Sequence, residues 1–179
     1  SPTGELHVGA ARTALYNFLL ARHTGGTMLF RVEDTDQKRY VPGSLARFMA
    51  DLAWLGIEFD EGPFIQSKHT PRHQAVAREL VAKGAAYYDF SSQAEVGARS
   101  EDEYRAGRSA YRSPDRRLDP AEAKRRVEAG ESFVIRLKVP ETGKISVLDL
   151  VRGRVEFDFS TIDDAVLLGE VGDDGFGVL

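Results

Sequence analysis

The sequence contains no cysteine, and this absence excludes disulfide bonds, thiolate metal sites and a thiol nucleophile. It also lacks any apolar run long enough to cross a membrane, since its longest runs, such as Ala165–Leu168, are only a few residues long. No charge of one sign prevails, because 24 basic and 28 acidic residues give a net charge of −4, so global charge does not indicate a nucleic-acid binder. The first residues have neither a basic start nor an apolar secretion segment, and we therefore expect a soluble cytoplasmic protein without membrane attachment.

The 179 residues, 42% of them hydrophobic, suffice for one domain or for a domain that carries an inserted module. The first half of the chain alternates helical and strand-like segments, which is typical of a parallel α/β sheet. Apolar periodicity and end signals predict helices that begin near Val8, Ser44 and Thr70. Apolar runs predict strands over residues 27–32 and 86–90. In the first helix, one face at helical spacing consists of Val8, Ala11, Leu15, Phe18 and Leu19.

The character of the sequence changes halfway along the chain. Ser92 and Glu95 have the spacing of a capping box, as do Asp119 and Glu122, and each pair predicts a helix start. Helices followed by clustered strands indicate an α+β module joined to the α/β start, with a boundary near residues 86–91. The predicted strands of this module cover residues 133–139, 145–150, 154–159 and 165–168.

One segment of the chain is locally basic. Residues 99–126 carry nine basic and six acidic residues, with Tyr104 and Tyr111 among them. Composition alone favours a solvated pair of charged helices. The alternative is a surface that contacts nucleic-acid phosphates, for which Arg116 and Arg117 are the candidates.

Residues 1–10 read S-P-T-G-E-L-H-V-G-A and carry the most informative chemical pattern of the chain. A polar turn delivers His7 and Gly9 to the start of a helix, where unpaired backbone N–H groups and a partial positive charge attract phosphate. Gly9 has no Cβ, so a ligand could approach the backbone closely, and His7 could donate a hydrogen bond to a phosphate oxygen. For this stretch taken alone, a plain glycine turn with an ordinary cap is the alternative.

Further blocks follow residues 1–10 in a specific order. Residues 11–17 read A-R-T-A-L-Y-N, and residues 25–36 read G-G-T-M-L-F-R-V-E-D-T-D. Together these blocks resemble the catalytic domain of the glutamyl-tRNA synthetases, a family of class I aminoacyl-tRNA synthetases. The glutaminyl relatives typically read F-D-D-T-N where this chain has V-E-D-T-D, so the resemblance favours glutamate. It extends over nearly the whole chain through F-V-I-R-L-K-V-P at 133–140, D-L-V-R-G at 149–153 and D-D-A-V-L-L at 163–168.

The resemblance implies a Rossmann-type nucleotide-binding half-domain, of α/β class, with an inserted α+β connective domain that binds the tRNA acceptor end. Residues 1–90 would form the first part of the catalytic domain, and residues 91–168 the inserted domain. Residues 169–179 would be a truncated return to the catalytic domain.

The resemblance also assigns roles to individual residues. His7 and Gly9 match the first and third letters of the H-I-G-H signature, which binds ATP and takes part in catalysis, while Ala10 stands at its fourth letter. Ser1 matches the serine that holds the glutamate substrate. Glu33 matches the acid that pairs with the substrate's α-amino group, since an ammonium in a closed pocket needs a compensating charge.

The loop after Glu33 is rich in polar residues. We interpret Asp34 and Asp36 as turn-forming and helix-capping residues rather than as metal ligands. Arg39, on the same loop, is a candidate contact for the tRNA acceptor strand or for a carboxylate. We predict no zinc site, because residues 88–92 read Y-D-F-S-S where some relatives begin a cysteine cluster.

The reaction implied by the resemblance has two steps and uses ATP with Mg²⁺, L-glutamate and tRNA(Glu). Glutamate attacks the α-phosphorus of ATP to give glutamyl-adenylate and pyrophosphate, and the terminal ribose of the tRNA then takes the glutamyl group. Such chemistry needs positioning and charge neutralisation more than a protein nucleophile, and the sequence offers no nucleophile–base pair. We expect a cytoplasmic monomer.

Three departures from the family pattern accompany the resemblance. The family has a strand before P-S-P-T-G that carries an arginine, a later K-[LM]-S-K loop, and K-x-D-G-x-P-T-Y after the segment that ends at Leu168. The only K-[LM]-S-K lookalike, G-K-I-S-V at 143–147, falls in the inserted domain. We therefore expect a fragment of a longer enzyme that is inactive alone. One alternative is a non-catalytic nucleotide- or tRNA-binding module. A second is a glutamyl-queuosine-type paralogue, and the complete E-D-T-D block and the missing cysteines argue against this second one only.

Overall fold

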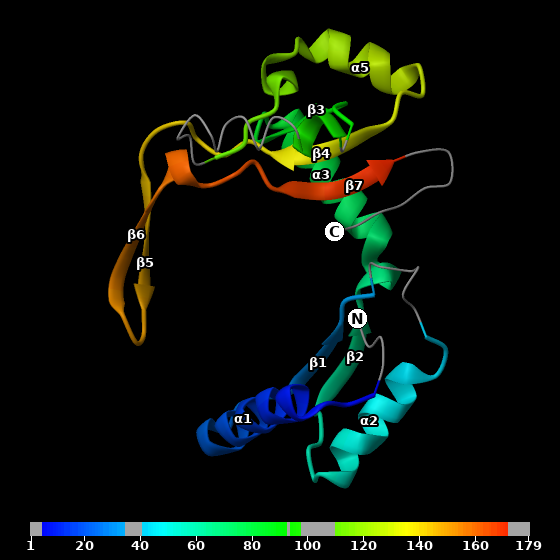
Figure 1. The fold of residues 1–179 in the computed structure, drawn as a ribbon, viewed down its shortest axis with the longest axis vertical. Helices are drawn as coiled ribbons and strands as arrows, with labels where there is room; N and C mark the ends of the chain where they lie inside the picture. The colour runs from blue at the N-terminus through cyan, green and yellow to red at the C-terminus, as the bar shows by residue number, and fades with distance from the viewer. Residues whose placement is uncertain (1–4, 35–40, 93, 98–109, 172–179) are drawn as a thin grey trace. The chain divides into compact units, whose positions relative to one another are not determined.

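The computed structural model describes residues 5–34, 41–92, 94–97 and 110–171, and Figure 1 traces their course. The chain divides into two compact units, Ser1–Thr70 and Pro71–Leu179. Within the described ranges, no helix combines the length and the apolar character that a membrane span requires.

The first unit is built around two short parallel strands. In this pair Arg31 lies opposite Phe64, and Val32 lies opposite Ile65. The alternation of helix and strand predicted for this part is confirmed, including the helix starts at Val8 and Ser44. The elements are α1 (Val8–Thr24), β1 (Leu29–Val32), α2 (Ser44–Trp54), β2 (Glu61–Ile65) and a 3-10 helix, η2 (Gln66–His69).

Strand β2 was not predicted from the sequence, because glycine and proline weaken a strand pattern. Gly62 adopts a positive φ of 108° that side chains rarely tolerate. A Cβ at this position would lie 2.5 Å from the carbonyl oxygen of Phe30, so only glycine lets β2 approach β1 this closely.

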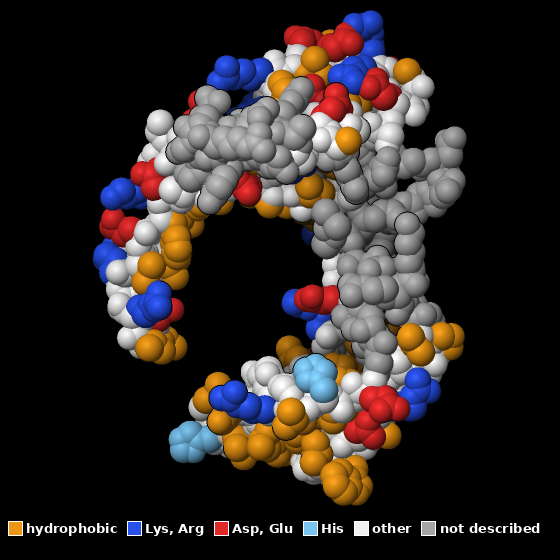
Figure 2. All heavy atoms as spheres, in the orientation of Figure 1, with side chains coloured by type: hydrophobic (Ala, Val, Ile, Leu, Met, Phe, Trp, Pro, Cys, Tyr) orange, Lys and Arg blue, Asp and Glu red, His pale blue; other side chains and the backbone are white. Residues whose placement is uncertain are grey.

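The apolar face of α1 that the sequence indicates is only partly buried. Ala11 and Phe18 are partly buried, but Val8, Leu15 and Leu19 are 87%, 43% and 52% exposed. The helix turns mainly small side chains toward its own unit, and the periodicity of apolar residues cannot tell which stripe is covered. Hydrophobic side chains consequently gather on the visible surface of the first unit, at the bottom of Figure 2.

The core of the first unit lies between β1 and α2. Leu52 is fully buried, and the ring of Phe30 stacks against Phe48 and Phe59 at centroid distances of 6.0 and 4.6 Å. At the amino ends of the two strands, the Asp60 carboxylate accepts hydrogen bonds from the backbone N–H of Met28 at 2.7 Å and from the Arg22 guanidinium at 2.7 Å. This contact ties the start of β2 to the start of β1.

The second unit contains an antiparallel sheet and a separate hairpin. The sheet has the strand order β3-β4-β7, and its core holds Ala77, Phe133, Ile135 and Leu168. The hairpin is made by β5 and β6, which pair over six positions. The elements are α3 (Thr70–Ala82, which begins at the last residue of the first unit), β3 (Ala86–Asp89), η3 (Pro114–Arg117), α5 (Pro120–Glu128), β4 (Phe133–Leu137), β5 (Lys144–Asp149), β6 (Gly153–Asp158), η4 (Phe159–Thr161) and β7 (Val166–Val171).

Most predicted starts and strands in this unit are confirmed. Asp119 caps α5 by accepting hydrogen bonds from the N–H groups of Ala121 and Glu122. Ser92 and Glu95 form the reciprocal hydrogen bonds of a capping box.

Two placements differ from the sequence-based division of the chain. Strand β3, which the sequence assigns to the first part, pairs antiparallel with β4, with Tyr87 opposite Arg136. Strand β7 continues through Val171, where it pairs with Phe133, so residues 169–171 extend this sheet instead of leaving it. A local pattern identifies a strand but not its partner, which explains both differences. The rest of the predicted return segment, residues 172–179, lies outside the described residues.

Candidate functional site

The predicted phosphate-binding turn begins at His7, which is the N-cap of α1. Its backbone is extended, at φ −103° and ψ 159°, and its Nδ1 accepts a hydrogen bond from the backbone N–H of Ala10 at 3.3 Å. Gly9 makes room for this arrangement, because a Cβ there would lie 3.1 Å from the ring atoms Cε1 and Nδ1 of His7. The sequence predicted that glycine would let a ligand approach, and the structure adds that it lets the imidazole fold back over the helix.

The cap leaves a donor on the histidine. Because Nδ1 accepts the hydrogen bond from Ala10, Nε2 is the ring nitrogen that remains to donate to a ligand. The first turn of α1 itself carries no acidic residue that would offset the partial positive charge of the helix start. An imidazole N–H donor beside unpaired backbone N–H groups is suited to an anionic ligand.

Glu33 follows the carboxyl end of β1. Its Oε1 pairs with Nη2 of Arg31 at 2.7 Å, and the two side chains are 57% and 72% exposed. Solvent screens such a pair, so it holds Glu33 only weakly and a competing cation can replace Arg31. In open α/β sheets, ligands bind outside the carboxyl ends of the strands, which is the position that Glu33 occupies.

Asp34 connects the ends of the two strands. Its Oδ1 accepts a hydrogen bond from the backbone N–H of Ser67 at 2.9 Å, and its Oδ2 accepts one from the Ser67 hydroxyl at 2.6 Å. Ser67 lies in η2, directly after β2. The sequence indicated a turn or capping role for Asp34, but it offered no signal that the partner lies 33 residues further along the chain.

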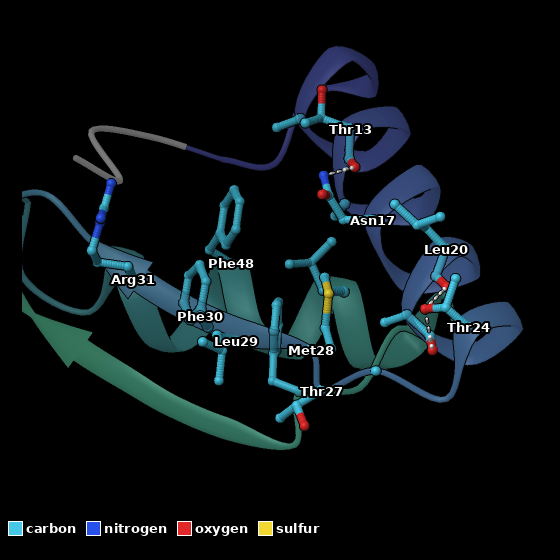
Figure 3. Close-up of a pocket in the computed structure, with 16 residues that line it drawn as sticks. Thr13, Asn17, Leu20, Thr24, Thr27, Met28, Leu29, Phe30, Arg31 and Phe48 are labelled. Atoms are coloured by element: carbon cyan, nitrogen blue, oxygen red, sulfur yellow. Dashed lines mark hydrogen bonds between the residues drawn. The ribbon is translucent and has the colours of Figure 1, made fainter. Parts of the chain in front are cut away.

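A cleft of about 740 Å³ lies between α1, β1 and α2 (Figure 3). Two polar side chains of α1 that line the cleft already donate hydrogen bonds to backbone carbonyls of the same helix. Asn17 donates to the carbonyl of Thr13 at 2.8 Å, and Thr24 donates to the carbonyl of Leu20 at 2.9 Å. Most of the remaining lining is apolar, with Phe30 and Phe48 among it. Such a lining suits packing better than recognition of charged substrates, so we place the candidate site at the strand ends instead.

Arg116, a predicted tRNA contact, lies in the interior of the second unit. It is 8% exposed, its Nη1 donates to both oxygens of the fully buried Asp164 at 2.9 and 2.8 Å, and its Nη2 donates to the carbonyl of Val139. All of these partners belong to the protein, so the prediction that Arg116 contacts tRNA is not retained. Arg117 is 81% exposed, and its Nη2 lies 3.6 Å from Glu141.

A second buried ion pair lies beside the first. Arg136 donates through Nε to the carboxylate of Asp89, which also accepts from the Ser113 hydroxyl at 2.8 Å. Burial alone would raise the pKa of Asp89, but the hydrogen bonds from Arg136, Ser113 and Ser91 outweigh it and lower that pKa. The pKa of Tyr87 is raised by burial of its side chain and by the negative charge of Asp164. The Tyr87 hydroxyl donates a hydrogen bond to Asp164 at 2.9 Å.

Two further predicted site residues, Ser1 and Arg39, lie outside the described residues. Within the part of the chain that the structure describes, no group of three or more histidine, aspartate or glutamate side chains could hold a metal ion. The absence of a zinc site therefore stays a prediction for the chain as a whole.

Comparison with known proteins identifies the class of the chain. Residues 1–171 match the family described as tRNA synthetases class I (E and Q), catalytic domain, and the chain belongs to this family. The predicted resemblance and the Rossmann-type α/β fold class are thereby confirmed.

Individual relatives are glutamate–tRNA ligases. The chain is 45% identical to that of Cytophaga hutchinsonii and 42% identical to that of Thermus thermophilus; each match covers 96% of this chain and 37% of the relative. It is also similar to the crystal structure of a glutamate tRNA ligase from Elizabethkingia meningosepticum in complex with its amino acid, with a TM-score of 0.80 and 33% identity. That match covers 99% of this chain and 38% of the solved one, so the chain spans well under half the length of these proteins.

Proposed function

We propose that this chain is the first part of a glutamate–tRNA ligase, which joins L-glutamate to tRNA(Glu) through glutamyl-adenylate at the expense of ATP. Two features of the first unit carry the proposal. The start of α1, at His7, is suited to bind phosphate, and an acid, Glu33, follows the carboxyl end of strand β1. The names of the relatives support glutamate and tRNA as substrates.

In the first step, ATP enters as its Mg²⁺ complex and binds at the start of α1. The Nε2–H group of His7 and the backbone N–H groups of Val8 and Gly9 donate to phosphate oxygens, whose negative charge builds up as the glutamate carboxylate attacks the α-phosphorus. No protein nucleophile is needed, because glutamate itself forms the new bond and pyrophosphate leaves.

Glu33 binds the α-ammonium of glutamate, and Ser1 assists in holding the amino acid. When the substrate arrives, its ammonium replaces the exposed guanidinium of Arg31 as the partner of Glu33. This exchange keeps Glu33 paired with a positive charge both without and with substrate.

The module that contains the β3-β4-β7 sheet serves as the connective domain that binds the acceptor end of the tRNA, with Arg117 on its surface. Arg39, which follows β1 in the sequence, is a separate candidate contact for the tRNA. Arg117 is exposed and charged, which suits a phosphate contact. The enzyme acts in the cytoplasm as a monomer and needs no zinc.

The test is ATP–pyrophosphate exchange by the full-length protein with tRNA(Glu) present. We expect glutamate to support exchange, glutamine and aspartate to support none, and glutamyl-tRNA to form when the assay contains all three substrates. Tight ATP and tRNA binding without glutamate-dependent exchange would favour the non-catalytic module instead.

A further inference from the structure

The two parallel strands of the first unit are tied together by an aspartate at each end. At the carboxyl ends, Asp34 accepts two hydrogen bonds from Ser67, at 2.9 and 2.6 Å. At the amino ends, Asp60 accepts hydrogen bonds from the N–H of Met28 and from Arg22, both at 2.7 Å. The first of these ties is adjacent in sequence to Glu33.

Glu33 needs such support because its own side-chain contact is weak. The ion pair with Arg31 is exposed on both sides, and exposed ion pairs contribute little. The direction of the Glu33 side chain therefore depends mainly on its backbone. Asp34 holds that backbone through hydrogen bonds to a carboxylate, which are shorter and stronger than those between neutral groups.

Ser67 is suited to this task by its place in the fold. It follows β2, which pairs with β1 up to Val32 and Ile65, the last residues of the two strands. The Asp34–Ser67 contact thus continues the strand pairing beyond its last residues, up to the loop that carries Glu33.

We propose that Asp34 and Ser67 are positioning residues for recognition of the amino acid: they hold the Glu33 carboxylate where it meets the α-ammonium of glutamate. The inference rests on the proposed function, because it takes Glu33 as the ammonium-binding group. Neither residue touches the substrate, and both act through the backbone of the loop after β1. Small displacements of a binding group lower affinity steeply, so loosening this loop weakens glutamate binding and leaves ATP binding intact.

The experiment measures ATP–pyrophosphate exchange by the full-length protein with tRNA(Glu), and separates the KM for glutamate from the KM for ATP. Asp34→Asn keeps the shape of the side chain but removes its charge and one acceptor, and should raise the KM for glutamate about tenfold. The KM for ATP and kcat should stay within about twofold of the wild-type values. Ser67→Ala should shift the KM for glutamate in the same direction but less, because the backbone N–H bond to Asp34 remains. Ser67→Thr retains the hydroxyl and should restore the wild-type KM.

Asp60→Asn is the matched control, since it makes the same chemical change in the tie at the opposite ends of the same strands. It should lower the melting temperature at least as much as Asp34→Asn without a selective change in the KM for glutamate. Equal effects of the two variants on that KM, a joint rise of both KM values, or a Ser67→Thr variant that behaves like Ser67→Ala would each overturn the positioning role. A wild-type protein without glutamate-dependent exchange would overturn the proposed function, and this inference with it.

Discussion

Gly9 leaves room for the imidazole of His7, because a Cβ at Gly9 would lie 3.1 Å from both Cε1 and Nδ1 of that ring. The two residues therefore act as one structural feature, in which the glycine accommodates the ring and the ring caps the helix. This relationship makes the first prediction a paired one.

His7→Ala should slow adenylate formation by about 10²–10³-fold, the usual effect of removing one donor that stabilises a transition state. Gly9→Ala should also slow it, but less, since the ring shifts by a few tenths of an ångström and remains present. Alanine is a better helix former than glycine, so Gly9→Ala should not lower the melting temperature. Single-turnover measurement of adenylate formation in the full-length protein checks both variants, and an unchanged rate in His7→Ala would contradict the proposed role of the ring.

Glu33→Gln preserves the shape of the side chain but removes its charge. The KM for glutamate should rise far more than the KM for ATP, because the lost interaction is with the α-ammonium of the amino acid. Steady-state ATP–pyrophosphate exchange at varied concentrations of each substrate provides the measurement. Proportional changes in both KM values would indicate a folding defect instead of a lost contact.

Arg117→Ala should weaken tRNA binding and reduce the slope of log affinity against log salt by about one unit, as expected for one lost phosphate contact. Lys83→Ala is a suitable control, because Lys83 is also an exposed cation but lies just after α3, where it pairs with Glu79. Equilibrium binding of tRNA(Glu) at several salt concentrations measures the slope. If both variants leave it unaltered, Arg117 belongs to a solvated surface.

Arg116→Met should destabilise the second unit by about 3–5 kcal/mol, because it leaves the buried carboxylate of Asp164 without its closest cation. Arg117→Met, one residue further on, should change stability by less than about 0.5 kcal/mol. Hydrogen exchange at the amides of β3 and β4 reports this difference in the full-length protein. Adding Asp164→Leu to Arg116→Met should recover little of the loss, since the Tyr87 hydroxyl and the Val139 N–H would then lose their buried acceptor.

Asp89 makes the second unit sensitive to acid. Its pKa is lower in the folded protein than the ordinary value of 3.8, so the unfolded chain binds the proton more readily. The stabilisation is therefore complete above pH 3.8 and declines as the pH falls below that value toward the pKa of the folded state. Asp89→Asn should be less stable than the wild type at pH 7, and the difference in melting temperature should shrink as the pH falls to about 3. A difference that stays constant with pH would contradict this assignment.

Local signals in the sequence were sufficient for many elements. The helix starts at Val8 and Ser44 and the cap at Asp119 depend on residues within one turn, so short-range patterns identify them. The His7–Gly9 pair of the candidate site is equally local, and the order of the residues alone is enough to recognise its motif.

Contacts between distant residues could not be predicted in this way. Arg116 looked like a surface cation, because charge counts say nothing about a buried partner 48 residues away. The contact between Asp34 and Ser67 is another example, since the sequence indicated a turn or capping role for Asp34 but gave no signal for its distant partner. Strand β2 was not predicted because Gly62 and Pro63 are untypical of strands. Yet Gly62 is what allows β2 to approach β1, since a Cβ there would clash with the carbonyl oxygen of Phe30.

The β5–β6 hairpin has its backbone paired over six positions, while every side chain of β5 is exposed. A two-stranded ribbon with so little burial gains almost nothing beyond its own hydrogen bonds, and such ribbons are only marginally stable in water. The hairpin can therefore open and close while the β3-β4-β7 sheet stays folded. We therefore expect its amide protons to exchange with solvent through this local opening, and at a higher rate than those of the β3-β4-β7 sheet.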